Sequence, residues 1–377
     1  MRRWQVAMKI KKAIQVVQLL RGAFTAGTAC AGPFFVSVDV TQRCNLRCIG
    51  CRFHSPEISL RQQDTAGQDV SYELVLRLCD ELKSLGGWRL IFIGQGEPLL
   101  HPRLVEMIAA AKAAGLEVFL ISNGTLLGGP MAAALVASGL DRIQVSLWAS
   151  SREEYERNHP GTPGTMYDKV LRGLDLVAAE KTAQRKRRPY VVLHHPLGRN
   201  THPHLERFAA VARAARCDAI SFGAWLSHRG TLNAHGVPPE EEAPLRRALE
   251  DLRLKLRGQP LQHNIAQVLE RYESGGAVWR STPCYIGWID ARVQTNGTVV
   301  PCGGCSLPVG NVSVSRLADI WNGPAYRDFR QRTRTCQGLE ALGPSCDCEF
   351  CCHLPANRRL HSLFRLGAPF ARRRASA

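Results

Sequence analysis

The chain has 377 residues, 45% of them hydrophobic, which is enough material for a large α/β domain with a smaller domain attached. Its 14 cysteines cluster at metal-like spacings in a chain far longer than small disulfide-stapled domains. We therefore expect reduced cysteines in a cytoplasmic protein rather than a secreted scaffold. Lysine and arginine outnumber aspartate and glutamate by 49 to 32, and the net charge of +17 favours anionic partners.

Residues 1–33 are predicted to form a basic amphipathic helix followed by a linker. Apolar side chains recur at helical spacing on one face, while the lysines fall elsewhere. The apolar face consists of Val6, Ile10, Ala13, Val17 and Leu20. Such a helix either lies on an anionic membrane as a peripheral contact or packs against the rest of the protein. The segment is too interrupted for a signal peptide, and no run approaches the ~18 apolar residues of a membrane span.

Three cysteines follow the first strand-like run within eight residues. Cys44, Cys48 and Cys51 form a C-x3-C-x2-C pattern. Three thiolates can ligate only three irons of a four-iron cluster, so the fourth iron would be open for chemistry. The alternative is a zinc site, for which His54 could supply the fourth ligand.

The residues around these cysteines carry a family resemblance. With the preceding Asp39-Val40-Thr41-Gln42-Arg43 and the internal Asn45-Leu46, the run resembles the cluster motif of radical S-adenosylmethionine (SAM) enzymes. The resemblance implies that the open iron of a 4Fe-4S cluster binds the amino and carboxylate groups of SAM. It also implies reductive cleavage of SAM to a 5'-deoxyadenosyl radical, which abstracts a hydrogen atom from a substrate. A reducing partner such as flavodoxin or ferredoxin would supply the electron.

A second motif ends the next strand-like run. The segment Gly94-Gln95-Gly96-Glu97-Pro98 is similar to the family's Gly-Gly-Glu-Pro segment, whose backbone and acid hold the SAM ammonium group. Glycines allow close backbone approach, and a carboxylate suits a cation. Gln95 departs from the family pattern and leaves open which carbonyl meets the ammonium. Glu97 could instead be an acid at a helix start.

Polar residues also end the third and fourth strand-like runs. By the same resemblance, Ser122, Asn123 and Ser146 are candidates to bind the ribose or carboxylate of SAM. Ordinary turn chemistry at the end of a buried strand is the alternative for each of them.

Between residues 34 and 257, short β-rich runs alternate with longer helical stretches. The predicted strands are 34–40, 89–94, 117–122, 142–147, 190–194 and 218–224. The predicted helices lie near 72–86, 103–115, 129–139, 166–180, 203–216 and 239–257. Alternation predicts right-handed crossovers and a parallel sheet, and six units fit a partial (β/α)6 TIM-like barrel, as the resemblance also implies. An open α/β sheet would place the site at the same edge.

A helical linker over 258–283 leads to a cysteine-rich segment, 284–353, and a basic tail, 354–377. The spacing of Cys284, Gly297 and Cys302, with an Asn-Gly hairpin turn between the cysteines, resembles the SPASM/twitch domain of radical SAM enzymes. The resemblance implies an auxiliary 4Fe-4S cluster, with Cys284, Cys302, Cys348 and Cys351 as its ligands. A zinc ribbon made by the same thiolates is the alternative. The spare cysteines, which could complete a second cluster or donate a hydrogen atom, are Cys305, Cys336, Cys346 and Cys352.

These motifs predict a radical SAM enzyme but do not name its substrate. Only 43 residues precede Cys44, too few for a leader-peptide-binding domain, which favours a non-peptide sugar, lipid or other small molecule. A peptide maturase is the alternative. A zinc- or RNA-binding protein is the alternative of another class. Aromatic residues make up only 7% of the chain, which argues against nucleic acid as a partner.

Overall fold

The computed structural model describes most of the chain, and its elements alternate as predicted. The described residues are 14–22, 25, 27–57, 68–199, 202–225, 235–272, 282–346, 351 and 353–372. The strands are β1 (Phe35–Asp39), β2 (Arg89–Ile93), β3 (Glu117–Ser122), β4 (Arg142–Ser146), β5 (Tyr190–Leu197), β6 (Ala219–Ala224), β7 (Gln262–His263), β8 (Asp290–Val293), β9 (Thr298–Val300) and β10 (Gly310–Asn311). The helices are α2 (Tyr72–Ser84), α3 (Leu104–Ala113), α4 (Gly129–Ala137), α5 (Arg152–Asn158), α6 (Thr165–Ala183), α7 (Leu205–Ala214), α8 (Pro239–Lys255), α9 (Ile265–Tyr272), α10 (Leu317–Trp321), α11 (Pro324–Thr333), α12 (Cys336–Glu340) and α13 (Leu354–Arg372).

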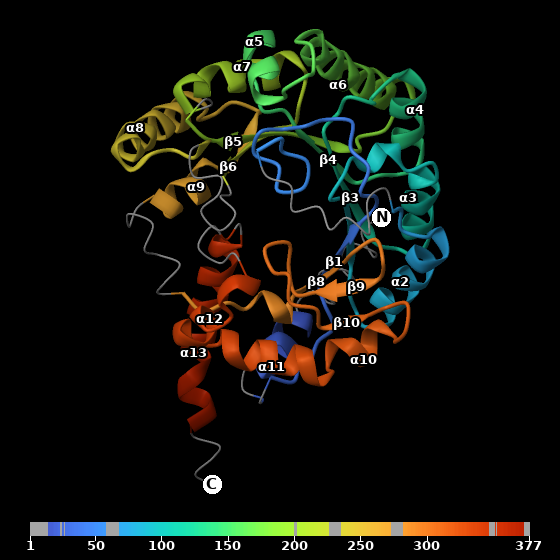
Figure 1. The fold of residues 1–377 in the computed structure, drawn as a ribbon, viewed down its shortest axis with the longest axis vertical. Helices are drawn as coiled ribbons and strands as arrows, with labels where there is room; N and C mark the ends of the chain where they lie inside the picture. Colours follow the sequence, from blue (N-terminus) through green and yellow to red (C-terminus); the bar gives the residue numbers. More distant parts are fainter. Residues whose placement is uncertain are drawn as a thin grey trace.

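Strands β1 to β6 lie in chain order in one parallel sheet, each paired with the next. The helices that connect them form an outer arc around the strands, as Figure 1 shows. This arrangement confirms the predicted partial barrel. It brings the carboxyl ends of all six strands to one edge, where the predicted site residues at the ends of β1, β2, β3 and β4 lie.

Alternation along each strand separates the two faces of the sheet. Val36 and Val38 of β1, like Leu90 and Phe92 of β2, are fully buried on the face that packs against the helices. Residues between them, such as Ile91, are half-buried on the inner face. A period of two in burial is expected for a sheet that is covered by helices on one side and curls around an interior on the other.

Alternating cations and aromatic rings line the start of the inner face. The Arg89 guanidinium lies 4.1 Å from the centre of the Phe119 ring, and the Arg142 guanidinium lies 5.4 Å from the same ring and 6.0 Å from the Tyr190 ring. Burial lowers the pKa of both arginines. Because these residues belong to β2–β5 near their amino ends, they occupy the end of the barrel opposite the motifs.

The cysteine-rich segment extends the barrel sheet. Strand β8 pairs in parallel with β1, and β8, β9 and β10 continue the sheet by antiparallel pairing. The β8–β9 turn is closed by a hydrogen bond from Gly297 N to Gln294 O, and Gly297 has a φ of 81°. Glycine adopts this left-handed conformation without strain, which explains the predicted Asn-Gly turn.

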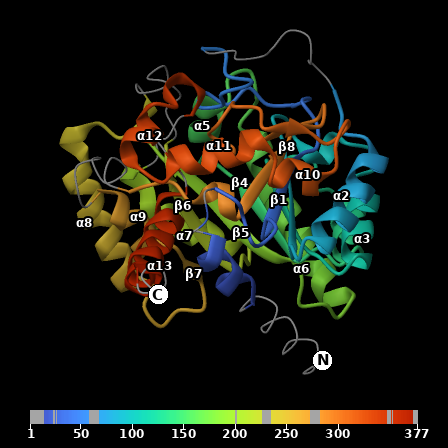
Figure 2. The ribbon, with the colours of Figure 1, turned by 90° about the horizontal axis from the view of Figure 1, so that it is seen from below.

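Helices α10, α11 and α12 cover the open side of the strand arc, opposite the outer helices. Figure 2 shows α10 and α11 in front of β1 and β8, with α12 beside α11. The fully buried Arg330 of α11 fixes this layer, since its Nε donates to Gly287 O at 2.7 Å and its Nη1 donates to Gly27 O at 3.1 Å. The guanidinium also lies 4.4 Å from the Trp321 ring centre.

The N-terminal helix packs through a face that the sequence pattern did not predict. Residues 14–22 are helical, and their buried side chains are Gln15, which donates to Gly86 O, and Leu19. Val17, assigned to the apolar face, is 52% exposed, as is Ile14; Leu20 packs partly against the core. Val6, Ile10 and Ala13 lie outside the described residues. Among the described helices, none is both long and apolar enough to cross a bilayer.

Candidate active site

The loop that carries the first three cysteines leaves β1 and packs directly on the end of β2. Gly96 N donates to Thr41 O at 2.9 Å, and Glu97 N donates to Arg43 O at 2.8 Å. A Cβ on Gly96 would lie 2.0 Å from Arg43 O, and one on Gly94 would lie 3.0 Å from Thr41 O. The glycines therefore make room for the backbone that precedes Cys44.

Cys44, Cys48 and Cys51 lie close enough to influence one another. Burial raises the pKa of Cys48, and the neighbouring thiols of Cys51 and Cys44 raise it further. Burial raises the pKa of Cys44 to about 11, and burial also raises the pKa of Cys51. Such thiols ionise readily only beside positive charge, which iron supplies, so the donor set fits a cluster.

Glu97 lies at the centre of the strand ends and is 2% exposed. Its Oε1 accepts from Ser122 Oγ at 2.7 Å and Leu99 N at 3.0 Å, and its Oε2 accepts from Asn123 N at 2.6 Å. A carboxylate has about four acceptor positions, so one remains for a further donor. Burial raises the pKa of Glu97. The negative charge of Glu97 in turn contributes to the raised pKa of Cys44 and of Cys48. Glu97 thus faces the cysteine loop.

A chain of side-chain hydrogen bonds joins the cysteine loop to the end of β3. Asn123 Nδ2 donates to Asn45 Oδ1 at 2.9 Å, and Asn45 Nδ2 donates to Thr125 Oγ1 at 2.8 Å. Thr125 Oγ1 donates back to Asn123 Oδ1 at 2.7 Å. Asn45, next to Cys44, is thereby held in one orientation. Sequence reasoning treated Asn123 as a ligand-binding candidate and missed this positioning role.

Two other predicted residues keep their side chains available. Gln95 lies half-buried between the two glycines, and Ser146 lies half-buried at the end of β4, opposite His194 of β5. In the described part of the chain, neither side chain makes a hydrogen bond, in contrast to Ser122, whose Oγ donates to Glu97 and accepts from Gly124 N. Gln95 and Ser146 are therefore better placed than Ser122 to meet a ligand.

Two aromatic residues that the sequence did not single out enclose the cysteines. A Cβ on Gly50 would lie 2.2 Å from the Trp225 ring, so the indole packs on the backbone between Cys48 and Cys51. Tyr155 of α5 is 1% exposed. Burial raises the pKa of its hydroxyl, and the nearby Cys48 and Cys44 thiols raise it further. A glycine between two ligand cysteines indicates close approach, but the spacing does not reveal which residue approaches.

The segments that carry the C-terminal cysteines meet one another. Asn357 of α13 donates to the Cys284 sulfur at 3.8 Å, and Ser306 N, near Cys302, donates to Ser345 O at 2.6 Å. Cys351 is described and half-buried, with its sulfur accepting from His353 N at 3.3 Å.

Cys348, the fourth predicted ligand, lies outside the described residues, as does the spare Cys352. Two other spare cysteines, Cys305 and Cys346, form a disulfide. The expectation that all cysteines are reduced is thus wrong for this pair, because a β-bridge holds the two backbones side by side. Cys336 is half-buried at the start of α12.

Two arginines connect the two cysteine regions. Arg52, next to Cys51, donates through Nη1 to Gly303 O at 2.8 Å, next to Cys302. Arg292 of β8 donates to both carboxylate oxygens of the buried Asp39, through Nε at 3.1 Å to each and through Nη2 at 2.5 Å to Oδ1. The three-cysteine loop and the hairpin are therefore fixed relative to each other.

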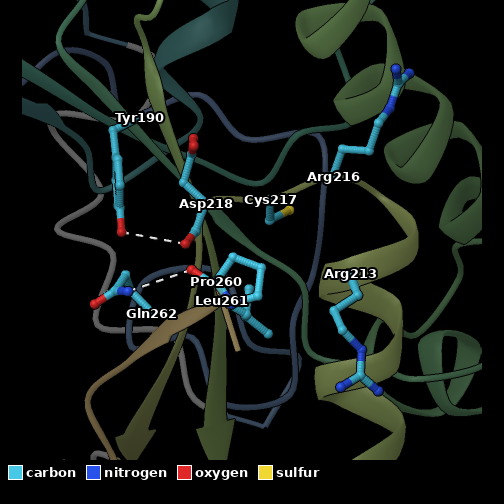
Figure 3. Close-up of a pocket in the computed structure, with 8 residues that line it drawn as sticks. All are labelled: Tyr190, Arg213, Arg216, Cys217, Asp218, Pro260, Leu261 and Gln262. Carbon is cyan, nitrogen blue, oxygen red and sulfur yellow. Dashed lines mark hydrogen bonds between the residues drawn. The ribbon is translucent and has the colours of Figure 1, made fainter. Parts of the chain in front are cut away.

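Two cavities of the described structure lie away from the motif residues. One of about 500 Å³ lies at the amino ends of β5–β7, with Tyr190 and Gln262 on one side and Arg213 and Arg216 on the other, as Figure 3 shows. Another of about 470 Å³ lies between the start of α2 and the β8–β9 turn. Loops at the amino ends of barrel strands contribute to stability rather than to catalysis, so the first cavity is not assigned to the site.

Within the described residues, no three His, Cys, Asp or Glu side chains converge closely enough to hold a single metal ion.

A partial barrel whose three-cysteine loop lies beside a buried carboxylate is typical of cluster-dependent α/β enzymes. A family profile described as "Radical SAM superfamily" matches residues 38–210, and one described as "Iron-sulfur cluster-binding domain" (SPASM) matches residues 284–354. The chain belongs to the radical SAM superfamily and carries a C-terminal SPASM domain. It is thus an enzyme whose cofactors are a 4Fe-4S cluster, SAM and an auxiliary iron-sulfur cluster.

Curated relatives match most of the chain. The PqqA peptide cyclase of Granulibacter bethesdensis is 27% identical over 334 residues, which cover 84% of this chain and 83% of the relative. The AdoMet-dependent heme synthase of Methanosarcina barkeri is 25% identical over 314 residues, which cover 79% and 85%.

Solved structures share the fold. Streptococcus suis SuiB bound to S-adenosylmethionine has a TM-score of 0.64 and 16% identity, and the match covers 86% of this chain and 74% of SuiB. Native anSMEcpe with bound AdoMet has a TM-score of 0.60 and 18% identity, and the match covers 80% and 84%. At these identities the likeness concerns the fold alone.

Proposed function

We propose that this radical SAM enzyme modifies a peptide substrate. The observation that carries the proposal is the likeness to PqqA peptide cyclases from two organisms, each 27% identical over 84% of this chain. This likeness supports a peptide substrate, the alternative hypothesis, better than the small-molecule substrate that the sequence alone favours. When bound, the reduced cluster supplies the electron that cleaves SAM to the 5'-deoxyadenosyl radical.

The three thiols of Cys44, Cys48 and Cys51 hold the SAM-binding cluster in this proposal. Their burial and mutual proximity support it. The auxiliary cluster is held by Cys284, Cys302, Cys348 and Cys351, of which the first two flank the β8–β9 hairpin.

SAM is held by the strand ends that surround the cysteine loop. The free acceptor position of Glu97 receives the ammonium group, with Gly94 and Gly96 keeping the backbone close. Gln95 and Ser146 contribute direct hydrogen bonds. Ser122 and Asn123 act first by orienting Glu97 and Asn45, since their own groups are already bonded.

A small anionic molecule is the second candidate substrate. Two AdoMet-dependent heme synthases, 25% and 24% identical over 79% and 78% of this chain, favour it, as does the net charge of +17. An iron tetrapyrrole that carries carboxylates has the chemistry such a charge would attract.

The test measures 5'-deoxyadenosine released by the anaerobically reconstituted, reduced enzyme with SAM. One reaction contains a pool of ribosomally encoded peptides, another contains an iron porphyrin that carries carboxylate groups, and a third contains no substrate. A peptide substrate predicts release above the substrate-free level, and a new mass for the peptide, only in the first reaction. Stimulation by the porphyrin alone would contradict the proposal.

Two cysteine variants distinguish the ligands of the SAM-binding cluster from those of the auxiliary cluster. Cys48→Ala should abolish SAM cleavage and remove about four irons per chain, whereas Cys284→Ala should lose only the auxiliary cluster. Zinc at stoichiometry with no SAM cleavage in the wild-type protein would refute the ligand assignment.

Two partners complete the proposal. A reduced flavodoxin or ferredoxin supplies the electron. The N-terminal helix contacts an anionic membrane peripherally, which is supported by the exposure of Ile14, Val16 and Val17 and by the five lysines and arginines among residues 2–12.

A further inference from the structure

The Tyr155 side chain is fully buried, yet its hydroxyl makes no hydrogen bond within the described structure. A buried hydroxyl without a partner costs about 1–3 kcal/mol, and folded proteins rarely retain one without a reason. Nearby Tyr167 shows the usual situation, since its hydroxyl donates to Ser150 O at 3.1 Å. The Tyr155 hydroxyl therefore calls for a partner that the described residues do not provide.

Tyr155 is held rigidly. It lies in α5, and its ring stacks on His159 with 4.0 Å between ring centres. His159 Nδ1 is 2.8 Å from Tyr155 O, and the Tyr167 ring packs against Tyr155 edge-on, with 6.4 Å between ring centres. The phenol cannot turn to find another partner without disturbing this packing.

The hydroxyl of Tyr155 lies near the cysteine loop. The end of α5 is bonded to that loop by Ile49 N, which donates to Asn158 O at 3.1 Å, and Ile49 lies between Cys48 and Cys51. Burial, and then the Cys48 and Cys44 thiols, raise the pKa of Tyr155, so its proton stays in place at neutral pH. A permanent O–H donor without a partner in the described structure thus lies near the Cys48 and Cys44 thiols.

We propose that Tyr155 donates a hydrogen bond to a sulfur atom of the cluster held by Cys44, Cys48 and Cys51, and that this bond raises the cluster's reduction potential. The proposal rests on the ligand assignment given above. Reduction adds negative charge to the sulfurs, and a donor stabilises that charge, so hydrogen bonds to sulfur are one determinant of cluster potential.

The test compares Tyr155→Phe with Tyr167→Phe in two states of the full chain. In the iron-free protein, Tyr155→Phe should unfold at a temperature equal to or above that of the wild type, because it removes a polar group without a partner. Tyr167→Phe should unfold at a lower temperature, because it leaves Ser150 O without its donor.

In the reconstituted protein without SAM or substrate, the reduced fraction of the first cluster is followed by EPR at fixed potentials. Tyr155→Phe should lower the ratio of reduced to oxidised cluster about tenfold, which corresponds to about 59 mV for a one-electron couple. Tyr167→Phe should leave the ratio unchanged. The auxiliary cluster serves as an internal reference, and Cys284→Ala identifies its signal.

Three results would overturn the proposal. They are an unchanged ratio in Tyr155→Phe, a loss of thermal stability of iron-free Tyr155→Phe equal to that of Tyr167→Phe, and a shift that occurs only after SAM is added, which would make SAM the acceptor. No substrate enters these measurements, so failure of the peptide proposal would leave their outcome unaffected.

Discussion

Gly96, after β2, lies where its backbone packs directly against the backbone of the loop that follows β1. Its amide donates to Thr41 O, and the Arg43 carbonyl occupies the space that a side chain would need. Gly96→Ala should therefore displace the cysteine loop, with a loss of stability of several kcal/mol and of most bound iron. Iron content after reconstitution and urea unfolding measure the two effects.

Gly128 offers a matched control. Nothing lies within 4 Å of a Cβ built on it, and its φ of −88° suits any residue. Gly128→Ala should keep its iron and change stability by less than about 1 kcal/mol. Equal iron content in the two variants would show that the close approach at Gly96 is not required.

At the residue level, the sequence predicts those site residues that lie close together within one short motif. Cys44, Cys48 and Cys51 and the motif at Glu97 could be recognised because each lies within a few positions. The contacts of Tyr155 and Trp225 with the cysteine loop could not, because each lies more than 100 residues away along the chain. Their placement depends on the packing of α5 and on the end of β6.

Strands β1 and β8 are joined by the buried ion pair of Asp39 and Arg292. Replacing one partner leaves the other charge buried and unpaired, which typically costs about 3–5 kcal/mol. Arg292→Met should thus lower the free energy of unfolding by about that amount, measured by urea titration of the iron-free protein. Lys255→Met removes the exposed pair with Glu206, which solvent screens, and should change the free energy of unfolding far less. Equal costs would contradict the role of burial.

The N-terminal helix allows a second prediction at the level of elements. Val16 and Val17 are 38% and 52% exposed, so replacing both with serine should leave folding intact. If the helix contacts a membrane, the double variant should sediment several-fold less with phosphatidylglycerol vesicles, and neither protein should sediment with phosphatidylcholine vesicles. Equal sedimentation of both proteins with the anionic vesicles would contradict this contact.

Element by element, the six barrel strands were predicted to within a few residues, since each is a short apolar run between helical stretches. The pairing of β8 with β1 was not, because the two strands are about 250 residues apart and no local pattern encodes which edges meet. The helix over 14–22 was predicted, but its buried face was not, because the bond of Gln15 to Gly86 O outweighs the apolar periodicity.

For the whole molecule, two buried histidines predict acid sensitivity. Burial lowers the pKa of His159 and of His194 to about 4, below the usual value of about 6.5. The stability that follows from neutral histidines is present above pH 6.5 and is lost as the pH falls towards 4. Each group should contribute a decline of about 1.4 kcal/mol per pH unit in that window.

Urea unfolding of the iron-free protein at pH 7 and pH 5 measures this decline. His194→Gln cannot gain a proton, so the variant should lose less stability between these two pH values than the wild type does. The same decline in both proteins would contradict a depressed pKa for His194.

The parallel pairing of β8 with β1 also has a consequence for how the protein can be divided. Removing residues 284–377 would strip β1 of its neighbour β8 and leave the backbone amides and carbonyls on that side of Phe35–Val38 unpaired. Such an edge is a template for intermolecular strand addition. The SPASM domain therefore covers the β1 edge of the barrel sheet. The barrel expressed without this domain should aggregate rather than remain monomeric.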